Sequence, residues 1–194
     1  MKKLLFSTVI MLLTAFSVNA QQKTEAELKA EREQIASELN SKDVIKRQEK
    51  LQKLHEKAVK VKKTDLGSID GLLETSTAVL GTVMSANDLL KKYGTEIKDN
   101  GNGDIEITKY AASLDDYKKL GVDLANAALL AADGAKRLES AQDDAKKLSP
   151  LKAKDALSSV SYSVDVLKLS AEEIELQTRI VTNLIESIKA SKNL

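Results

Sequence analysis

Side chains with oxygen donors gather between residues 99 and 104, where the chain reads Asp-Asn-Gly-Asn-Gly-Asp. Carboxylate and amide oxygens are the ligands that Ca²⁺ prefers, and Gly permits the tight turn that brings such side chains together. The candidate binding residues of this loop are Asp99, Asn100, Asn102 and Asp104. Capture of a cation is therefore the first chemistry to consider for this chain.

Residues 100–105 resemble the centre of an EF-hand loop, with a Gly at the sharp turn. The resemblance implies that Asn100 and Asn102 would be side-chain ligands. The two ends of such a loop would fall on Lys98 and Lys109, where the motif needs an Asp and a bidentate Glu. Because two ammonium groups repel a cation, we expect a Gly- and Asn-rich turn here and no metal site.

The chain has no Cys and one His, which leaves little for catalysis. Thiolate chemistry, Cys–His pairs and the two Glu-x-x-His motifs of di-iron bundles lack their residues. His55 stands among charged residues, which is typical of an exposed histidine. No Gly-x-Ser-x-Gly elbow or P-loop occurs. We expect no enzyme activity, no cofactor and no small-molecule substrate. Three acidic residues near the C-terminus are expected to lie in solvent: Glu172, Glu173 and Glu175.

A basic run precedes residue 64 and is offset by only two acids, Glu49 and Glu56. Such a face can contact anionic lipid, a polyanion or an acidic partner, or it can simply be solvated near Asp115 and Asp116. We favour the solvated face. The chain as a whole has 30 Lys and Arg against 29 Asp and Glu, so no net field favours nucleic acid. The candidate binding residues of this face are Lys46, Arg47, Lys50, Lys53, Lys57 and Lys60.

The first 20 residues have the pattern of a secretory signal peptide. Lys2 and Lys3 precede an apolar run that is too short to span a bilayer, and a small-x-small sequence ends at Ala20. We expect cleavage after Ala20 and a periplasmic or secreted protein. Both Phe residues lie in this segment, and the chain has no Trp, so few aromatic side chains remain for stacking on bases or sugars.

Apolar spacing of three and four predicts four long helices, over residues 24–63, 65–93, 113–148 and 150–190. The first is expected to break at residues 40–43 with Ser41 as a cap, and Ser113 with Asp116 resembles a capping box. The fold class is then an all-α, elongated antiparallel bundle. We expect a charged N-terminal helix at residues 21–63, and a bundle core at residues 64–194 with a tip loop at 94–112.

Two segments carry finer predictions. Residues 95–108 are expected to form a short β-hairpin or loop that pairs Ile97 with Ile107. Thr77, Gly81 and Ser85 form a ridge of small residues that we expect to pack against the Ala-rich third helix.

The whole pattern resembles the broad group of exported, Cys-free helical-bundle proteins of Gram-negative envelopes. That resemblance implies a non-enzymatic protein that acts through helix–helix contacts, with a protein partner or with itself. The alternative is a membrane-active protein, because long helices with a possible tip hairpin also resemble α-helical pore-forming toxins of the cytolysin A type. The tip here is polar rather than apolar, so we favour the first hypothesis.

Overall fold

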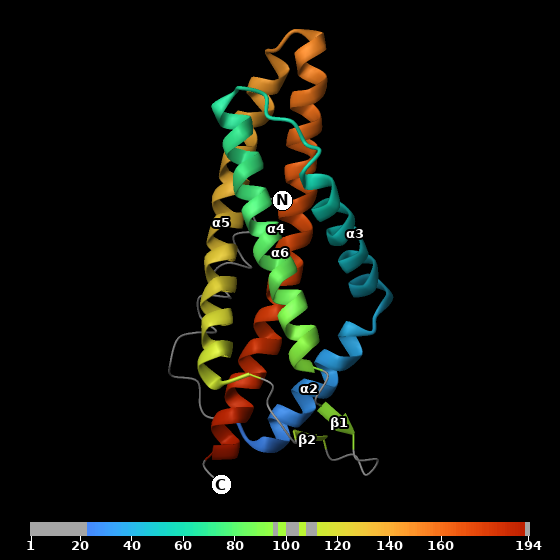
Figure 1. The fold of residues 1–194 in the computed structure, drawn as a ribbon, viewed down its shortest axis with the longest axis vertical. Coiled ribbons are helices and arrows are strands. Elements are labelled where there is room, and N and C mark those ends of the chain that lie inside the picture. The colour runs from blue at the N-terminus through green and yellow to red at the C-terminus, as the bar shows by residue number, and fades with distance from the viewer. Residues whose placement is uncertain (1–22, 95–96, 100–104, 108–111, 193–194) are drawn as a thin grey trace.

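The computed structural model is an elongated bundle of antiparallel helices (Figure 1). It describes residues 23–94, 97–99, 105–107 and 112–192, and the predicted signal peptide lies outside them. Successive long elements alternate in direction along the bundle axis, which confirms the predicted all-α class. The helices are α2 (Glu25–Leu39), α3 (Lys42–Ala58), α4 (Gly67–Gly94), α5 (Leu114–Lys146) and α6 (Pro150–Lys192).

The helices α4, α5 and α6 pack on one another and hold the main core. Most apolar side chains that recur at a spacing of three and four along these helices are buried or partly buried, whereas Leu157 on α6 is exposed. Polar side chains of α6 such as Ser163 and Gln177 are buried as well. The Ala-rich face of α5 allows close approach. A Cβ added at Gly134 would lie 2.9 Å from Cδ1 of Leu167, so this helix crossing depends on the missing side chain.

Two serines begin helices where the sequence predicts. The Ser41 hydroxyl accepts a hydrogen bond from the N–H of Val44 at 3.3 Å and starts α3. The Ser113 hydroxyl accepts from the N–H of Asp116 at 3.2 Å, and the Asp116 carboxylate accepts from the N–H of Ser113 at 2.9 Å. Hydrogen bonds from the hydroxyl and the N–H of Ser113 hold the pKa of Asp116 below its usual value. Capping thus sets both helix starts.

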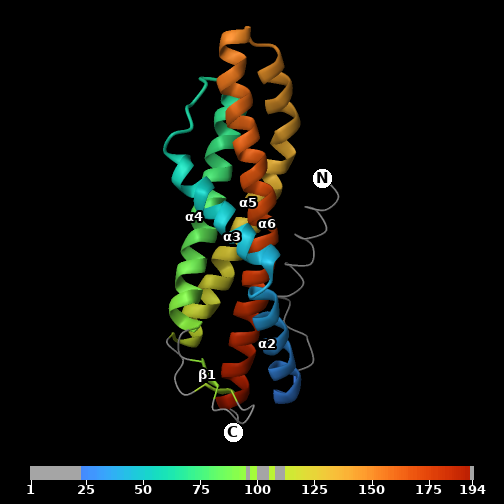
Figure 2. The same ribbon diagram turned by 90° about the vertical axis from the view of Figure 1, so that its right-hand side faces the viewer.

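Residues 23–58 form a segment that we call the strap, because it lies across the outside of the three-helix core (Figure 2). Within the strap, α2 packs on α6, and α3 packs on both α4 and α6. The break between them falls at residues 40–41, as predicted. Only four apolar side chains of the strap are buried, in two pairs whose members are seven positions apart: Leu28, Ile35, Val44 and Leu51.

The strap ends at Ala58, five residues earlier than the predicted helix end, and residues 59–66 then cross to α4. Asp65 has a φ of 62°, in the left-handed region that Asp tolerates better than most residues. The carboxylate of Asp70 accepts the N–H groups of Thr64 at 2.7 Å and of Asp65 at 3.0 Å. These bonds satisfy backbone donors outside the helix and keep the crossing non-helical.

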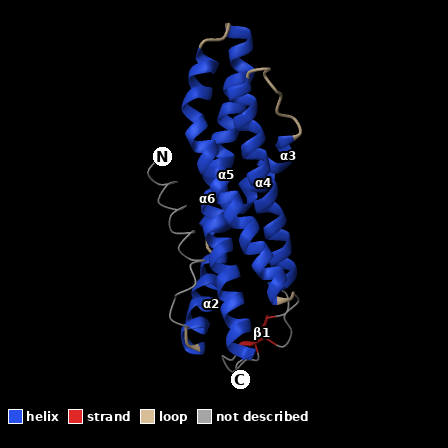
Figure 3. Cartoon of the chain, turned by 90° about the vertical axis from the view of Figure 1, so that its left-hand side faces the viewer, coloured by secondary structure: helices blue, strands red, loops and turns tan. Residues whose placement is uncertain are grey.

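A two-stranded hairpin lies at the end of the bundle beside the C-terminal end of α4 (Figure 1; red in Figure 3). Strands β1 (Ile97–Asp99) and β2 (Ile105–Ile107) are antiparallel, and Ile97 pairs with Ile107 as predicted. The residues of the turn itself lie outside the described part of the chain.

Candidate functional site

Of the tip-loop candidates, only Asp99 falls among the described residues, at the end of β1 opposite Ile105. Asn100, Asn102 and Asp104 lie outside them, so the expectation that this loop binds no cation stays a prediction. Within the described residues, no group of three or more His, Asp or Glu side chains is arranged to hold a metal ion.

Five of the six basic candidates are exposed on the outer surface of α3 or just after it. They are Lys46, Lys50, Lys53, Lys57 and Lys60. We expected this face to lie near Asp115 and Asp116, but these two residues have other partners. Asp115 pairs with Lys118 at 3.0 Å and Asp116 caps α5, whereas α3 packs on α4 and α6.

Unlike these five lysines, Arg47 is mostly buried: its side chain is only 13% exposed and points to α6. Its Nε donates to Oε2 of Glu173 at 2.8 Å, and Nε2 of Gln48 donates to Oε1 of the same carboxylate at 2.9 Å. Glu173 is only 1% exposed, so our prediction that it is solvated is wrong. Spacing alone could not show this, because the residue lies beneath α3, whose position depends on the tertiary fold. Glu172 and Glu175 are exposed as predicted.

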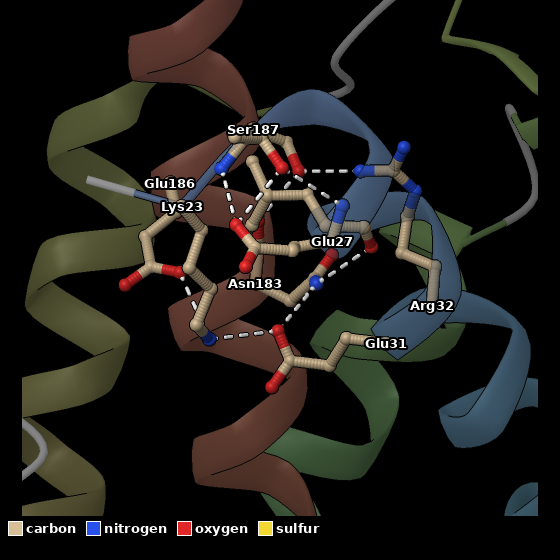
Figure 4. Close-up of polar contacts among 9 residues, drawn as sticks. Lys23, Glu27, Glu31, Arg32, Asn183, Glu186 and Ser187 are labelled. Carbon is tan, nitrogen blue, oxygen red and sulfur yellow. Dashed lines mark hydrogen bonds and ion pairs between the residues drawn. The ribbon is translucent and has the colours of Figure 1, made fainter. Parts of the chain in front are cut away.

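A second polar cluster joins the start of the strap to the end of α6 (Figure 4). Nζ of Lys23 lies 2.9 Å from Glu31 and 3.2 Å from Glu186. Nδ2 of Asn183 donates to Oε2 of Glu31 at 2.9 Å, so the Glu31 carboxylate is bonded from two sides. Nearby, Nη1 of Arg32 donates to the hydroxyl of Ser187 on α6.

These contacts shift the pKa values of both charged groups. Burial would raise the pKa of Glu31, but hydrogen bonds from Asn183 and Lys23 outweigh it and bring the pKa below its ordinary value. Burial would likewise lower the pKa of Lys23, but its bonds to Glu31 and Glu186 leave the pKa raised. The docked strap therefore stabilises the charged form of each group.

Hydrogen bonds from α6 to backbone carbonyls hold the strap and the crossing segment further. They run from Asn183 Nδ2 to Leu28 O at 3.1 Å, from Tyr162 Oη to Leu54 O at 3.3 Å and from Ser159 Oγ to Lys62 O at 3.0 Å. Burial raises the pKa of the Tyr162 hydroxyl above its ordinary value. Near the C-terminal end of α2, Nη1 of Arg179 on α6 pairs with the Glu38 carboxylate at 2.6 Å. Hydrogen bonds and ion pairs thus hold the strap against much of the length of α6.

An open groove of about 490 Å³ runs along the other side of the bundle, between α4 and α5. Its lining residues are Ala78, Gly81, Thr82, Ser85, Asp123, Asn126, Ala127 and Leu130. The expectation that the small-residue ridge packs against α5 is wrong: Thr77 and Ser85 are exposed, and a Cβ added at Gly81 would meet no atom of another helix within 4 Å. Gly81 and Ser85 of the ridge instead line the groove together with Asn126 and Leu130 of α5.

Exposed apolar side chains accompany this groove. Leu130 lines it and is 42% exposed, while Leu129 and Val122, on the adjoining surface of α5, are 48% and 58% exposed. Leu89 on α4 is also partly in solvent. An apolar surface beside a recess of small residues can receive the side chains of another helix.

The remaining candidates for chemistry lie apart from one another. His55 is exposed on α3, as predicted, and the buried hydroxyl of Ser76 donates to Ser163 at 3.0 Å within the core. Nε2 of Gln177 donates to Val83 O and to Asn87, again inside the bundle. These polar groups join helices to one another.

Comparison with known proteins gives no relative: no protein-family model matches the chain, and no curated protein or solved structure matches it. None of the described helices combines the length and apolar content needed to cross a bilayer.

Proposed function

We propose that the chain is an exported, non-enzymatic helical-bundle protein that binds another protein through helix–helix contacts. The observation that carries the proposal is the α4–α5 groove. Small side chains form its floor, and an exposed apolar residue, Leu130, stands in its wall. Such a recess accepts an amphipathic helix, because backbones approach closely over small residues and large apolar side chains fill the space between.

The rest of the molecule is consistent with a binding or structural role. The strap and α6 are joined by ion pairs and hydrogen bonds within the chain, whereas the groove has an exposed apolar side chain in its wall. The occupant that we propose is a helix of a different protein in the cell envelope.

Photocrosslinking in cells tests the proposal. A photoreactive residue replaces Ser85 or Asn126, which line the groove, and in the control it replaces Lys154, an exposed residue of α6. We expect one distinct heavier species in envelope fractions from the groove positions and none from the control, with mass spectrometry identifying the partner. Crosslinks between copies of this chain alone, or equal crosslinking at all three positions, would contradict the proposal.

A groove-filling substitution provides a second arm. Ser85→Trp should abolish the crosslink from Asn126, because the indole occupies the space of the incoming helix. Ser140→Trp, at an exposed position of α5 outside the lining, should leave it unchanged. Dye leakage from anionic liposomes at low protein concentration would instead support the membrane-active alternative and contradict the binding proposal.

Export is tested separately. The small-x-small sequence before residue 21 places the expected cleavage after Ala20. The intact mass of the protein recovered outside the cytoplasm should correspond to residues 21–194. Recovery of a species that retains Met1 would favour an N-terminal anchor.

A further inference from the structure

The exposed lysines of α3 form a single row. At 100° per residue, positions 46, 50, 53 and 57 fall within an arc of about 60°. All four side chains are exposed, and none has an ion-pair partner within the described residues. Glu49 and Glu56 lie to one side of the row, and Glu56 accepts a hydrogen bond from Gln52 at 3.0 Å. We call Lys46, Lys50, Lys53 and Lys57 the lysine row.

Charge is strongly segregated toward this part of the chain. Residues 42–63 contain nine of the 30 Lys and Arg but only three of the 29 Asp and Glu, which leaves 21 basic and 26 acidic residues elsewhere. A nearly neutral molecule therefore presents a local positive surface and a negative remainder. Such a distribution attracts a negatively charged partner to one place, whereas the net charge would not.

The helix that carries the row is held in position from beneath. Val44 and Leu51 are buried, and Arg47 and Gln48 both bond to the buried carboxylate of Glu173. Arg47 is the one cation of this run that turns inward, so fixing the helix does not use the lysine row. A fixed backbone presents the four ammonium groups at a constant spacing, which reduces the ordering cost of binding.

The spacing and the surroundings of the row define its partner. Lysines one helical turn apart repeat at about 5.4 Å, which is also the repeat of carboxylates along a second helix. A flat lipid surface is less suitable, because Val44 and Leu51 of α3 are buried against the core and cannot insert. The exposed apolar side chains here, Ile45 and Val59, lie about 100° or more around the helix from the middle of the row, so they would not enter a surface that the row contacts. Sugar recognition usually adds aromatic platforms, and the chain has no Trp.

We propose that the lysine row is a docking surface for an acidic helix of a partner protein. This interaction goes beyond the α4–α5 groove: it uses a different surface, is electrostatic rather than apolar, and stands whether or not the groove is occupied. Because the ammonium groups are exposed, the docking is sensitive to salt.

The test uses a synthetic Ala-rich helical peptide with Glu at positions i, i+4, i+7 and i+11, whose binding is followed by fluorescence anisotropy at about 10 mM salt, where screening is weak. Substitution of Gln at all four lysines of the row should weaken binding about 10- to 30-fold, which corresponds to four exposed ion pairs. The matched control places Gln at four exposed lysines of α6 with the same change in net charge: Lys152, Lys154, Lys168 and Lys189.

We expect the control to bind within about two-fold of the parent and the affinity to fall steadily as salt rises. Replacement of the row by Arg, which keeps the charge, should preserve binding, and circular dichroism checks that each variant is folded. Equal losses in both Gln variants would show a general charge effect and overturn the proposal. Absence of peptide binding, or tighter row-dependent binding of heparin or anionic vesicles, would also overturn it.

The Ser85→Trp variant separates this inference from the proposed function. It should bind the acidic peptide as the parent does, since the groove is not part of the row. Loss of the groove crosslink with intact peptide binding would support two independent surfaces, whereas loss of peptide binding in this variant would contradict an independent lysine row.

Discussion

Glu173 shows how one buried side chain links the strap to the core. Its carboxylate accepts hydrogen bonds from Arg47 and Gln48, and both donors come from α3. A buried ion pair adds little net stability, because desolvation offsets much of the Coulomb attraction. Removing one partner is different, since it leaves the other charge buried without compensation. The two partners are also unequal: Arg47 has a second acid, Glu172, at 3.7 Å, whereas Glu173 has no second cation among the described residues.

This asymmetry gives the first prediction. Arg47→Met should lower the free energy of unfolding by about 3 kcal/mol, because it leaves the buried Glu173 carboxylate without a cation. Glu173→Met should cost less, since Arg47 can still pair with Glu172 and reach water. The double variant should be more stable than Arg47→Met alone. Urea unfolding of the four proteins measures this. Strictly additive losses would show that the pair is not coupled.

Two glycines on neighbouring helices provide a second, matched prediction. Gly81→Ala should stabilise the protein by about 0.5–1 kcal/mol, because Ala favours the helix and no atom of another helix lies within 4 Å of the new Cβ. Gly134→Ala gains the same helix preference but places its Cβ 2.9 Å from the buried Leu167 side chain. It should therefore be neutral or destabilising by about 1 kcal/mol. Thermal unfolding compares the two, and an equal gain would show that Leu167 moves freely.

At the scale of elements, the strap differs from the helices of the core in what holds it. Four buried apolar side chains anchor it, and the other contacts are mainly ion pairs and hydrogen bonds to α6. Some of these polar groups are incompletely satisfied, since Nε of Arg32 and Oδ1 of Asn183 are buried without a hydrogen-bond partner. Each such atom reduces the benefit of docking. We infer that α2 detaches from α6 more readily than α4, α5 and α6 separate.

The pH dependence of α2 follows from the pKa of Glu31. Because docking lowers this pKa, its stabilising effect is fully present above the unfolded value near 4.5 and is lost as pH falls through the folded value. Amide hydrogen exchange, corrected for intrinsic rates, should show α2 opening before the core helices do as the pH falls below 4.5, the ordinary pKa of the Glu31 carboxyl. Glu31→Gln should open α2 more at neutral pH and flatten the response. Simultaneous opening of α2 and the core would contradict the inference.

At the scale of the whole molecule, three helices form a core with two unlike outer surfaces. The strap covers one side of this core, while the α4–α5 groove leaves apolar side chains in solvent on another. Removing residues 23–58 would expose the apolar and polar groups of α6 that now contact the strap. That surface would then be free to associate with a second copy.

This arrangement gives the last prediction. A chain that begins at residue 59 should remain helical but bind a hydrophobic dye and form dimers or larger species, as measured by circular dichroism and light scattering. The control is Arg179→Met, which breaks one strap contact with Glu38 and should leave the oligomeric state as in the parent chain. A truncated chain that stays monomeric without dye binding would show that the strap covers no associating surface.

Local sequence determines the elements of this protein. Capping side chains such as Ser41 and Ser113 act within four residues, and the apolar spacing of α4 to α6 specifies which faces are buried, so both were predictable. The pairing of Ile97 with Ile107 was also predictable, since a short turn between alternating residues restricts the register.

Only the tertiary structure decides what lies opposite each face. Glu173 is buried and Gly81 is open because of where α3 and α5 pass, and their paths depend on contacts between residues far apart in the chain. Arg47 and Glu173 are 126 positions apart, and no local pattern encodes such a pair. The sequence therefore determined helices, caps and charge segregation, whereas tertiary packing decided which charges are buried and which small residues border a groove.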